Sequence, residues 1–267
     1  MSFPLKNIQH ILMLYKNIKL IPMIGIELEF YLPNKKMKIS DNSYANFNIY
    51  EIVSEAAFGQ FEAKFQHTTN IVSLIKNVQL FKKYFMKVHS ANFSAKPLVD
   101  KPGSSQHVNI SFLKNNINIL VKNNKLLCNA IGGLCELIPN SMIYFAPTQS
   151  SYMRYIHKCY HTPTTVSWGI NNRTTAIRIV KTFNNNMDYR IENRLPGSDA
   201  STLSIISAIL LAIYHGIEKN LISKKPIYGL GDDPIYNLPT IPMNLTEAKK
   251  YSPTLSLLKQ YCKTVKD

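Results

Sequence analysis

The sequence predicts an α+β fold in which helices flank one mainly antiparallel sheet. Several short segments alternate polar and apolar residues, which is typical of strands with one face on a core and one face open. Helical segments of uneven length separate these strands. The 267 residues contain no internal repeat and no linker, so we expect a single domain over residues 1–267.

The composition supports a filled core and an anionic partner. Hydrophobic residues make up 45% of the chain and aromatic residues 10%, which disfavours disorder. The formal net charge of +15 favours nucleotides, carboxylates or other anions as ligands. The excess is mostly lysine spread along the chain, and no basic run is interleaved with aromatic residues, so nucleic-acid binding is not expected.

The cysteines and apolar runs predict a soluble cytoplasmic protein. Four cysteines form no CxxC pair and have no zinc-site spacing, which fits a reducing compartment. The first twenty residues lack the small-residue cleavage site of a signal peptide. The longest apolar run, 205–213, is shorter than a membrane span, so no membrane partner is expected.

The first third of the chain combines a helix with two strands. Residues 5–20 place apolar side chains on one helical face. Residues 24–31 alternate two glutamates with large apolar residues and predict a strand. After a polar loop at 33–48, the segment 51–65 alternates again in its second half, which indicates another strand.

The middle of the chain contains the clearest helix. Residues 69–89 repeat apolar positions every 3.6 residues with lysines on the opposite face. We expect a short strand at 91–93 and a longer one at 107–112, where polar and apolar residues alternate. Residues 126–138 are apolar enough for a buried helix.

The last third adds strands and the most apolar helix. Ser201 can cap a helix that extends to about residue 220. The remaining predicted elements are strands at 166–169, 175–179 and 189–195, a loop at 226–242, and one or two short helices within 245–265.

Acidic groups recur on the polar faces of these strands. Glu27 and Glu29 point the same way on a strand, roughly 7 Å apart at their Cα atoms. Two such charges repel, so a positive group is expected between or over them. Further acidic or imidazole groups follow at Glu55, Glu62, His107 and Glu192. Five glutamates and one histidine suit a site for two divalent cations such as Mg²⁺ or Mn²⁺.

Five arginines complement this acidic set. They are Arg154, Arg173, Arg178, Arg190 and Arg194. Guanidinium groups bind phosphates and carboxylates bidentately, and metal ions together with arginines are typical of phosphoryl transfer. Each residue also has a structural interpretation: the glutamates as solvated surface groups, His107 as a core histidine, and the alternation around Glu192 as a surface ladder.

Six segments together resemble the catalytic domain of the glutamine synthetase family, from about Ile24 to about Leu255. The segments, in the order of the family, are GIELEF, EAAFGQFEAKF, SAKPLVDKPGSSQHVNIS, APTQSSYMRY, TPTTVSWGINNRTTAIRI and YRIENRLPGSDAS. Their wording resembles the branch that joins glutamate to amines other than ammonia, as gamma-glutamylpolyamine synthetases do. The resemblance implies a curved, mainly antiparallel sheet flanked by helices.

The resemblance also implies roles for individual residues. One metal would be held by Glu29, Glu55 and Glu62, and the other by Glu27, His107 and Glu192. Gly103, Arg154 and Arg194 match the glutamate-binding positions; Arg173 and Arg178 match the arginines at the nucleotide phosphates; and Ser111 and Arg190 lie where the family binds ATP. The implied catalytic set is Arg173, Arg178 and Glu62. ATP would phosphorylate the γ-carboxylate of glutamate, and an amine would then displace the phosphate.

The chain departs from the family pattern in several places. Only 23 residues precede Ile24, where the family has a small β-grasp domain, so we expect a short helix in its place. The segment 157–163 carries no carboxylate, which disfavours ammonia as the amine. Pro102 and Asn109 replace a usual asparagine and histidine, and the chain ends without the final helices of the family.

Three interpretations of function follow. The first is an ATP- and metal-dependent ligase of glutamate and an amine, acting as a homo-oligomer or with a full-length relative. The second is a catalytically impaired binding or regulatory protein that retains metal or nucleotide. The third is a ligase of the glutamate–cysteine type, which the specific sequences of the six motifs disfavour.

Overall fold

The computed structural model describes residues 5–33, 42–159, 161–182, 188–251, 256–257 and 260–261. Its helices, including three short 3-10 helices, are α1 (Leu5–Asn17), η1 (Asn42–Phe47), α2 (Ile71–His89), α3 (Asn124–Phe145), η2 (Ser150–Tyr152), α4 (Met153–Ile156), α5 (Thr202–Glu218), η3 (Pro234–Tyr236) and α6 (Leu245–Lys250). Its strands are β1 (Ile21–Tyr31), β2 (Ile49–Ser54), β3 (Gln60–Thr68), β4 (Gln106–Lys114), β5 (Ile117–Asn118), β6 (Trp168–Ile170), β7 (Ile177–Thr182) and β8 (Asp188–Asn193).

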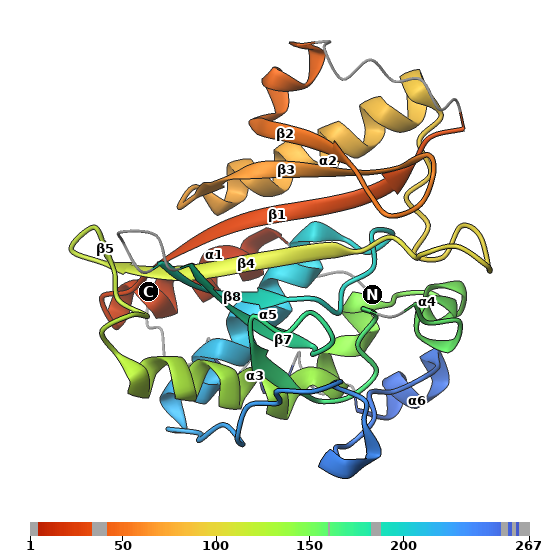
Figure 1. Cartoon of the computed structure of the whole chain (residues 1–267). Helices are drawn as coiled ribbons and strands as arrows, with labels where there is room; N and C mark the ends of the chain where they lie inside the picture. Colours follow the sequence, from red (N-terminus) through yellow and green to blue (C-terminus); the bar gives the residue numbers. More distant parts are fainter. Residues whose placement is uncertain are drawn as a thin grey trace.

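One eight-stranded sheet organises the chain (Figure 1). Its order is β2-β3-β1-β4-β8-β7-β6, with β5 paired to β4. All neighbouring strands are antiparallel except β6 and β7, which are parallel. The predicted α+β class with a mainly antiparallel sheet is therefore confirmed.

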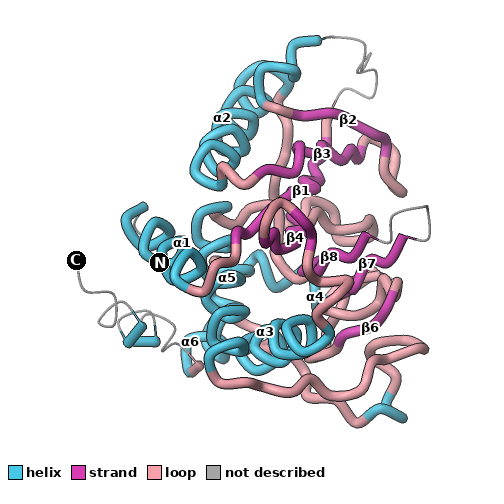
Figure 2. The backbone as a smooth tube through the Cα atoms, turned by 90° about the vertical axis from the view of Figure 1, so that its left-hand side faces the viewer, coloured by secondary structure: helices cyan, strands magenta, loops and turns pink. Residues whose placement is uncertain are grey.

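The long helices α1, α2, α3 and α5 gather on one side of this sheet (Figure 2). Along β1 the apolar residues Ile24, Ile26, Leu28 and Phe30 are buried in the core cluster. The two glutamates of the strand alternate with them, because successive side chains on a strand point to opposite faces. The core therefore fixes which face of β1 presents its carboxylates.

The helices α3 and α5 form the base of the core. Between Thr202 and Gly216, α5 is almost entirely buried, as expected for a helix that is apolar on all sides. By length and composition α3 would be able to cross a membrane, but 67% of its apolar window is buried inside the fold. That burial, against α5, is the behaviour of a core helix.

Glycine allows α3 and α5 to approach closely. A Cβ atom on Gly133 would lie 2.1 Å from the carbonyl oxygen of Ala212, and one on Gly216 would lie 2.1 Å from that of Asn129. Both distances are far inside van der Waals contact with backbone atoms, which cannot rotate away. The crossing therefore depends on the absence of side chains at these two positions.

Two sequence predictions need correction. The segment 91–93 is not a strand: Asn92 makes only an isolated bridge with Tyr31, and its side-chain oxygen accepts the Ser94 N–H at 2.8 Å, which turns the chain away. The helix predicted at 126–138 extends through Pro139 to Phe145, because the residues after the proline bury an apolar face.

Other elements were missed or fall partly outside the described residues. Strand β2 has no clean alternation of burial, and β5 is only two residues long, so neither carried a pattern. Of the predicted loop at 33–48, residues 34–41 are not described. Of the predicted helices within 245–265, α6 is confirmed, and residues 252–255, 258–259 and 262–265 lie outside the described part.

We predict that Gly133→Ala destabilises the fold. Alanine has a helix propensity about 1 kcal/mol better than glycine, but the overlap with the Ala212 carbonyl should outweigh it and lower the free energy of unfolding by about 1–3 kcal/mol. Urea denaturation measures the change. Ser73→Ala on the exposed face of α2 is the control and should change stability by less than about 0.5 kcal/mol. Equal stability of the two variants would show that the helices separate freely.

Candidate active site

The register of the sheet places charged groups directly opposite one another. Across β1 and β3, Glu29 faces Glu62; across β1 and β4, Glu27 faces His107. On the far side of β4, Glu192 of β8 stands between Asn109 and Arg178 of β7. Five adjacent strands thus bring groups that are far apart in sequence to one face of the sheet.

These side chains line a cavity of about 470 Å³. Of the site residues predicted from the sequence, all but Ser111 belong to its described lining: Glu27, Glu29, Glu55, Glu62, Gly103, His107, Arg154, Arg173, Arg178, Arg190, Glu192 and Arg194. Acidic groups come from β1, β3, β8 and the turn after β2, and the arginines come from α4, β7, β8 and neighbouring loops. The cavity therefore joins an acidic wall to a basic one.

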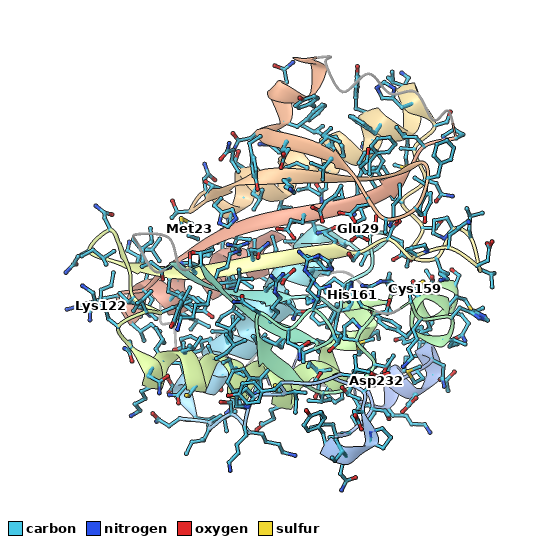
Figure 3. The ribbon with its side chains drawn as sticks, in the orientation of Figure 1. Met23, Glu29, Lys122, Cys159, His161 and Asp232 are labelled. Carbon is cyan, nitrogen blue, oxygen red and sulfur yellow. The ribbon has the colours of Figure 1, made fainter. Side chains whose placement is uncertain are left out.

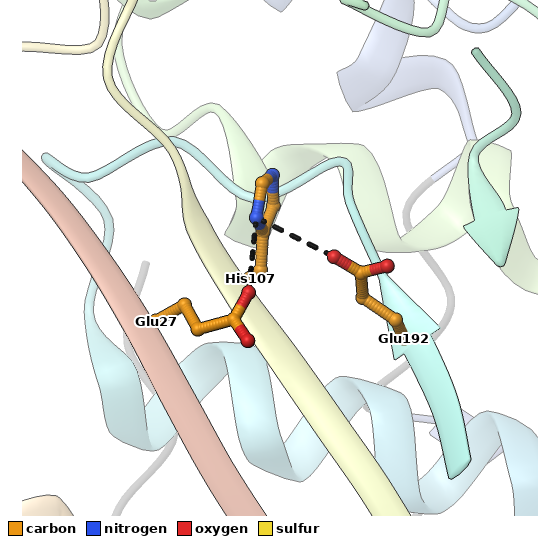
Figure 4. A group of neighbouring side chains, drawn as sticks. All are labelled: Glu27, His107 and Glu192. Carbon is orange, nitrogen blue, oxygen red and sulfur yellow. Dashed lines mark ion pairs between the residues drawn. The ribbon is translucent and has the colours of Figure 1, made fainter. Parts of the chain in front are cut away.

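His107 lies between two carboxylates (Figure 4). Its Nδ1 atom is 3.7 Å from Glu27 Oε2 and 3.6 Å from Glu192 Oε1. Its Nε2 atom is 2.9 Å from the hydroxyl of Ser105, which fixes the orientation of the ring. Burial alone would raise the pKa of Glu27, but His107, with Arg190 and Asn109, lowers that pKa to about 2.

Glu29, Glu55 and Glu62 form the more strongly acidic part of the cavity. Burial, reinforced by the charges of Glu27, Glu29 and Glu55, raises the pKa of Glu62 to about 9. Burial and the charge of Glu29 also raise the pKa of Glu55. The ion pairs found among the described residues include none of these three carboxylates, although Glu29 accepts the Ser105 N–H at 2.7 Å.

The donor set fits divalent cations. The ligand atoms of Glu27, His107 and Glu192 lie within 4.8 Å of one another, and so do those of Glu29, Glu62 and His107. Carboxylate oxygens with one imidazole suit Mg²⁺ or Mn²⁺, and a cation would relieve the repulsion around Glu62. The first group equals one of the ligand sets implied by the sequence. The second group differs from the other implied set, Glu29, Glu55 and Glu62. It contains His107 in place of Glu55, and Glu55 lines the cavity without belonging to the group.

The basic wall is partly occupied by pairing within the protein. Glu192 accepts Arg194 at 2.7 Å and Arg178 at 3.1 Å. The Nε of Arg194 donates to the backbone carbonyl of Arg173 at 3.0 Å. The buried Nε of Arg178 has no partner among the described residues, so this guanidinium keeps an unused donor beside the cavity.

Arg154 is held by the chain that follows β8. It is buried and donates to the carbonyls of Leu195 at 2.7 Å and Arg194 at 3.1 Å. Its stem passes Gly103 so closely that a Cβ atom there would lie 2.8 Å from Arg154 Cγ and 2.6 Å from the Ala95 carbonyl oxygen. Only glycine fits at position 103 without moving the arginine.

Ser111 is the predicted site residue that the structure keeps apart. It is buried on β4, two residues beyond Asn109, and faces Met23 of β1. Asn109 itself is engaged with Arg190, whose Nε donates to Asn109 Oδ1 at 2.9 Å. Arg190, held by Asn109, thus belongs to the cavity lining, whereas Ser111 lies beyond this pair along β4.

Sequence reasoning missed several lining residues. Ser105 orients His107, and Gln60 donates to the Gly103 carbonyl at 3.0 Å; both sit inside quoted motifs next to assigned residues. Cys159, His161 and Thr162 also line the cavity, although the sequence showed only that their segment lacks a carboxylate. The presence of His161 there was the available signal.

Comparisons with known proteins give matches over most of the chain. The sequence model of the family described as glutamine synthetase, catalytic domain, matches residues 36–262. Gamma-glutamylputrescine synthetase of Escherichia coli (strain K12) is 29% identical over 79% of this chain and 54% of its own length. Type-1 glutamine synthetase 2 of Dictyostelium discoideum is 31% identical over 78% of this chain and 42% of its own length. Glutamate–isopropylamine ligase of a Pseudomonas species is 31% identical over 52% of this chain and 31% of its own length.

Solved structures share the fold. The ADP complex of GmaS superposes with a TM-score of 0.77 at 19% identity, covering 97% of this chain and 71% of that one. Glutamine synthetase of Plasmodium falciparum gives a TM-score of 0.76 at 18% identity, and the match covers 97% of this chain and 74% of that one. The chain spans about half the length, or less, of the curated relatives described above.

We predict that Glu62→Gln stabilises the metal-free protein at alkaline pH. The folded state holds the proton of Glu62 up to a pKa of about 9, above the ordinary value of 4.5, so the free energy of unfolding falls as pH rises between these values. Removing this group should raise that free energy by more than about 1 kcal/mol at pH 8. Denaturation in chelator measures the change.

The matched control for this variant is Glu51→Gln. Glu51 lies on neighbouring β2, and its carboxylate forms an exposed ion pair with Lys64. We expect a change below about 1 kcal/mol. In saturating Mn²⁺ the wild-type protein should gain more stability than Glu62→Gln, because it loses no ligand. If metal-free Glu62→Gln is less stable than the metal-free wild-type protein at pH 8, the ionised Glu62 side chain does not destabilise the fold and the prediction is wrong.

Proposed function

Since this chain belongs to the glutamine synthetase family by its catalytic domain, we propose that it is an ATP- and divalent-metal-dependent ligase. The reaction joins the γ-carboxylate of glutamate to an amine. ATP first phosphorylates that carboxylate, and the amine then displaces phosphate from γ-glutamyl phosphate. The acidic and basic walls of one cavity support this chemistry, since phosphoryl transfer depends on positioning and charge neutralisation.

The observation that carries the proposal is the carboxylate pair Glu29 and Glu62. The sheet holds these residues opposite each other although like charges in that position are destabilising. A structural role does not require such a pair, whereas Mg²⁺ or Mn²⁺ commonly binds through one or two carboxylates. The metals would be held by Glu27, His107 and Glu192 and by Glu29, Glu55 and Glu62, and they would neutralise phosphate charge.

The arginines would hold the two anionic substrates. Arg178 has an unpaired buried Nε–H beside the cavity, and Arg173 lies on the same wall, so both are suited to the phosphates of ATP. Arg190 would contact the nucleotide at its end of the cavity. Arg154 and Arg194, with the close-packed Gly103, would hold glutamate, its α-carboxylate and its reacting end. Together they would align the γ-carboxylate with the γ-phosphate.

We expect the nucleophile to be an amine other than ammonia. Two of the relatives are named for such reactions, with putrescine in one and isopropylamine in the other. The segment 157–163, of which Cys159, His161 and Thr162 line the cavity, carries no carboxylate that would bind an ammonium ion.

We further expect a cytoplasmic protein that acts as a homo-oligomer or with a longer relative. The exposed apolar side chains of Phe58 and Val99 are consistent with such an association.

A second function is favoured by one observation. Glu192 is already neutralised by Arg178 and Arg194, so a cation must share this carboxylate with two guanidiniums. A protein that binds metal or nucleotide in this state without turnover would act as a regulatory relative. Turnover separates the two functions.

We predict amine-stimulated ADP release by the purified chain with ATP, Mg²⁺ and glutamate. A panel of amines that includes putrescine and isopropylamine gives the substrate range. Glu192→Gln keeps the size of the side chain but removes one charge from the His107 group, and should lower the rate at least about 100-fold. Glu218→Gln, exposed at the end of α5, is the matched control and should act like wild type.

Two results would count against the ligase. No ADP release with any amine, while metal and nucleotide still bind, would support the regulatory protein. Release that is equally fast in Glu192→Gln would show that the activity does not use this cavity.

A further inference from the structure

The loop that carries Gly103 is held by two side chains that face each other across β1 and β3. Tyr31 and Gln60 are direct partners in the ladder between these strands. The hydroxyl of Tyr31 donates to the Pro102 carbonyl at 2.8 Å. The amide nitrogen of Gln60, Nε2, donates to the next carbonyl, that of Gly103, at 3.0 Å. Two neighbouring side chains thus fix two successive carbonyls of the loop.

Gln60 differs from Tyr31 because part of its side chain is left without a partner. The residue is 3% exposed and lines the cavity, and Tyr31 is not part of the described lining. Its nitrogen is engaged by Gly103, but its amide oxygen, Oε1, has no hydrogen-bond partner among the described residues. A buried polar atom that lacks a partner costs free energy. We therefore expect a ligand in the cavity to supply the missing hydrogen bond.

The surroundings of this oxygen favour a positively charged donor. An amide oxygen only accepts, so its partner must carry an N–H or O–H group. Gln60 is the first residue of β3 and lies in the chain between Glu55 and Glu62. In Figure 3, Glu29 lies toward the end of β1 that is far from Met23, and this is the end that pairs with Gln60. Three carboxylates close to one acceptor attract a cation such as an ammonium group.

Gly103 connects this acceptor to a cationic side chain. A Cβ atom at Gly103 would lie 2.8 Å from Cγ of Arg154, so the glycine contacts both Arg154 and the amide of Gln60. An α-amino acid carries an ammonium and a carboxylate on one carbon atom. A neutral acceptor and a guanidinium on the same short loop match this pair of groups, because guanidinium binds carboxylate.

Resting on the ligase function proposed above, we propose that Gln60 is a specificity-determining residue for the α-ammonium group of glutamate. Its Oε1 accepts an N–H of the ammonium while Arg154 binds the α-carboxylate. The same amide holds the Gly103 carbonyl, so one side chain both shapes the loop and selects the substrate. A dicarboxylate without an amino group, such as glutarate, leaves Oε1 unsatisfied and binds more weakly.

The test compares the binding of L-glutamate and glutarate to the full chain by isothermal titration calorimetry, with Mg²⁺ and ADP present. The wild-type protein should prefer L-glutamate at least about 10-fold. Gln60→Met keeps nearly the size of the side chain but has no amide, and its preference should be at least about 10-fold lower. A loss that acts through the loop weakens both ligands, so the ratio of their affinities reports on the oxygen. Gln60→Ala should show the same fall in preference.

Tyr31→Phe is the matched control, because it removes the neighbouring anchor of the loop and leaves the amide in place. It should keep the wild-type preference. A titration with Mn²⁺ should give the same affinity for wild type and Gln60→Met within about 3-fold, since the oxygen is assigned to the ammonium and not to a metal.

Four results would overturn the inference. The preference could be unchanged in both Gln60 variants, or it could fall as much in Tyr31→Phe as in Gln60→Met. Mn²⁺ affinity could fall with the loss of the amide, which would make Oε1 a metal ligand. The wild-type protein could also bind L-glutamate without preferring it to glutarate. Each of these leaves the ligase standing, whereas a wild-type protein that does not bind L-glutamate at all would overturn the ligase itself.

Discussion

The repulsion between Glu29 and Glu62 is the constraint on which the rest of the site depends. Their strands hold them opposite each other in the ladder, and the burial of Glu62 weakens the screening of the charges by water. The register cannot slip by one residue to separate them, because Ile26, Leu28 and Phe30 would then leave the core. The hydrophobic effect thus enforces an electrostatically unfavourable cluster, and burial together with the neighbouring carboxylates raises the pKa of Glu62 to about 9.

The two walls of the cavity balance this cluster in different ways. Toward β8, Glu192 finds two guanidiniums and His107, so that side is compensated by protein cations. Toward β3, none of the described ion pairs includes Glu29 or Glu62. A cation bound on this side would therefore gain the most favourable electrostatic energy. Cation and anion sites within one 470 Å³ cavity are what a reaction between ATP and a carboxylate substrate requires.

Much of this arrangement could be predicted from the sequence, for physical reasons. Alternation in β1 and β4 fixed the faces of Glu27, Glu29 and His107. The periodicity of α2 is strong because this helix buries one apolar face, whereas α5 was recognised because it is apolar on all sides. Which strands are neighbours in the sheet depends on contacts between distant parts of the sequence. The sequence alone therefore could not show that His107 belongs to both groups of ligand atoms. The end of α3 was misjudged because tertiary burial overrode the helix-breaking tendency of Pro139. His161 was overlooked because the other residues that line the cavity beside it, such as Arg178 and Arg194, are distant in sequence.

The most direct test of the central claim is an anomalous difference map from crystals of the protein grown with Mn²⁺. The account predicts manganese peaks on the acidic wall, one among Glu27, His107 and Glu192 and one beside Glu29 and Glu62. Ordered manganese at both positions would show that the fold maintains the repulsion in order to hold metal. A map with no manganese at these carboxylates, from crystals in which their side chains are well ordered, would contradict it.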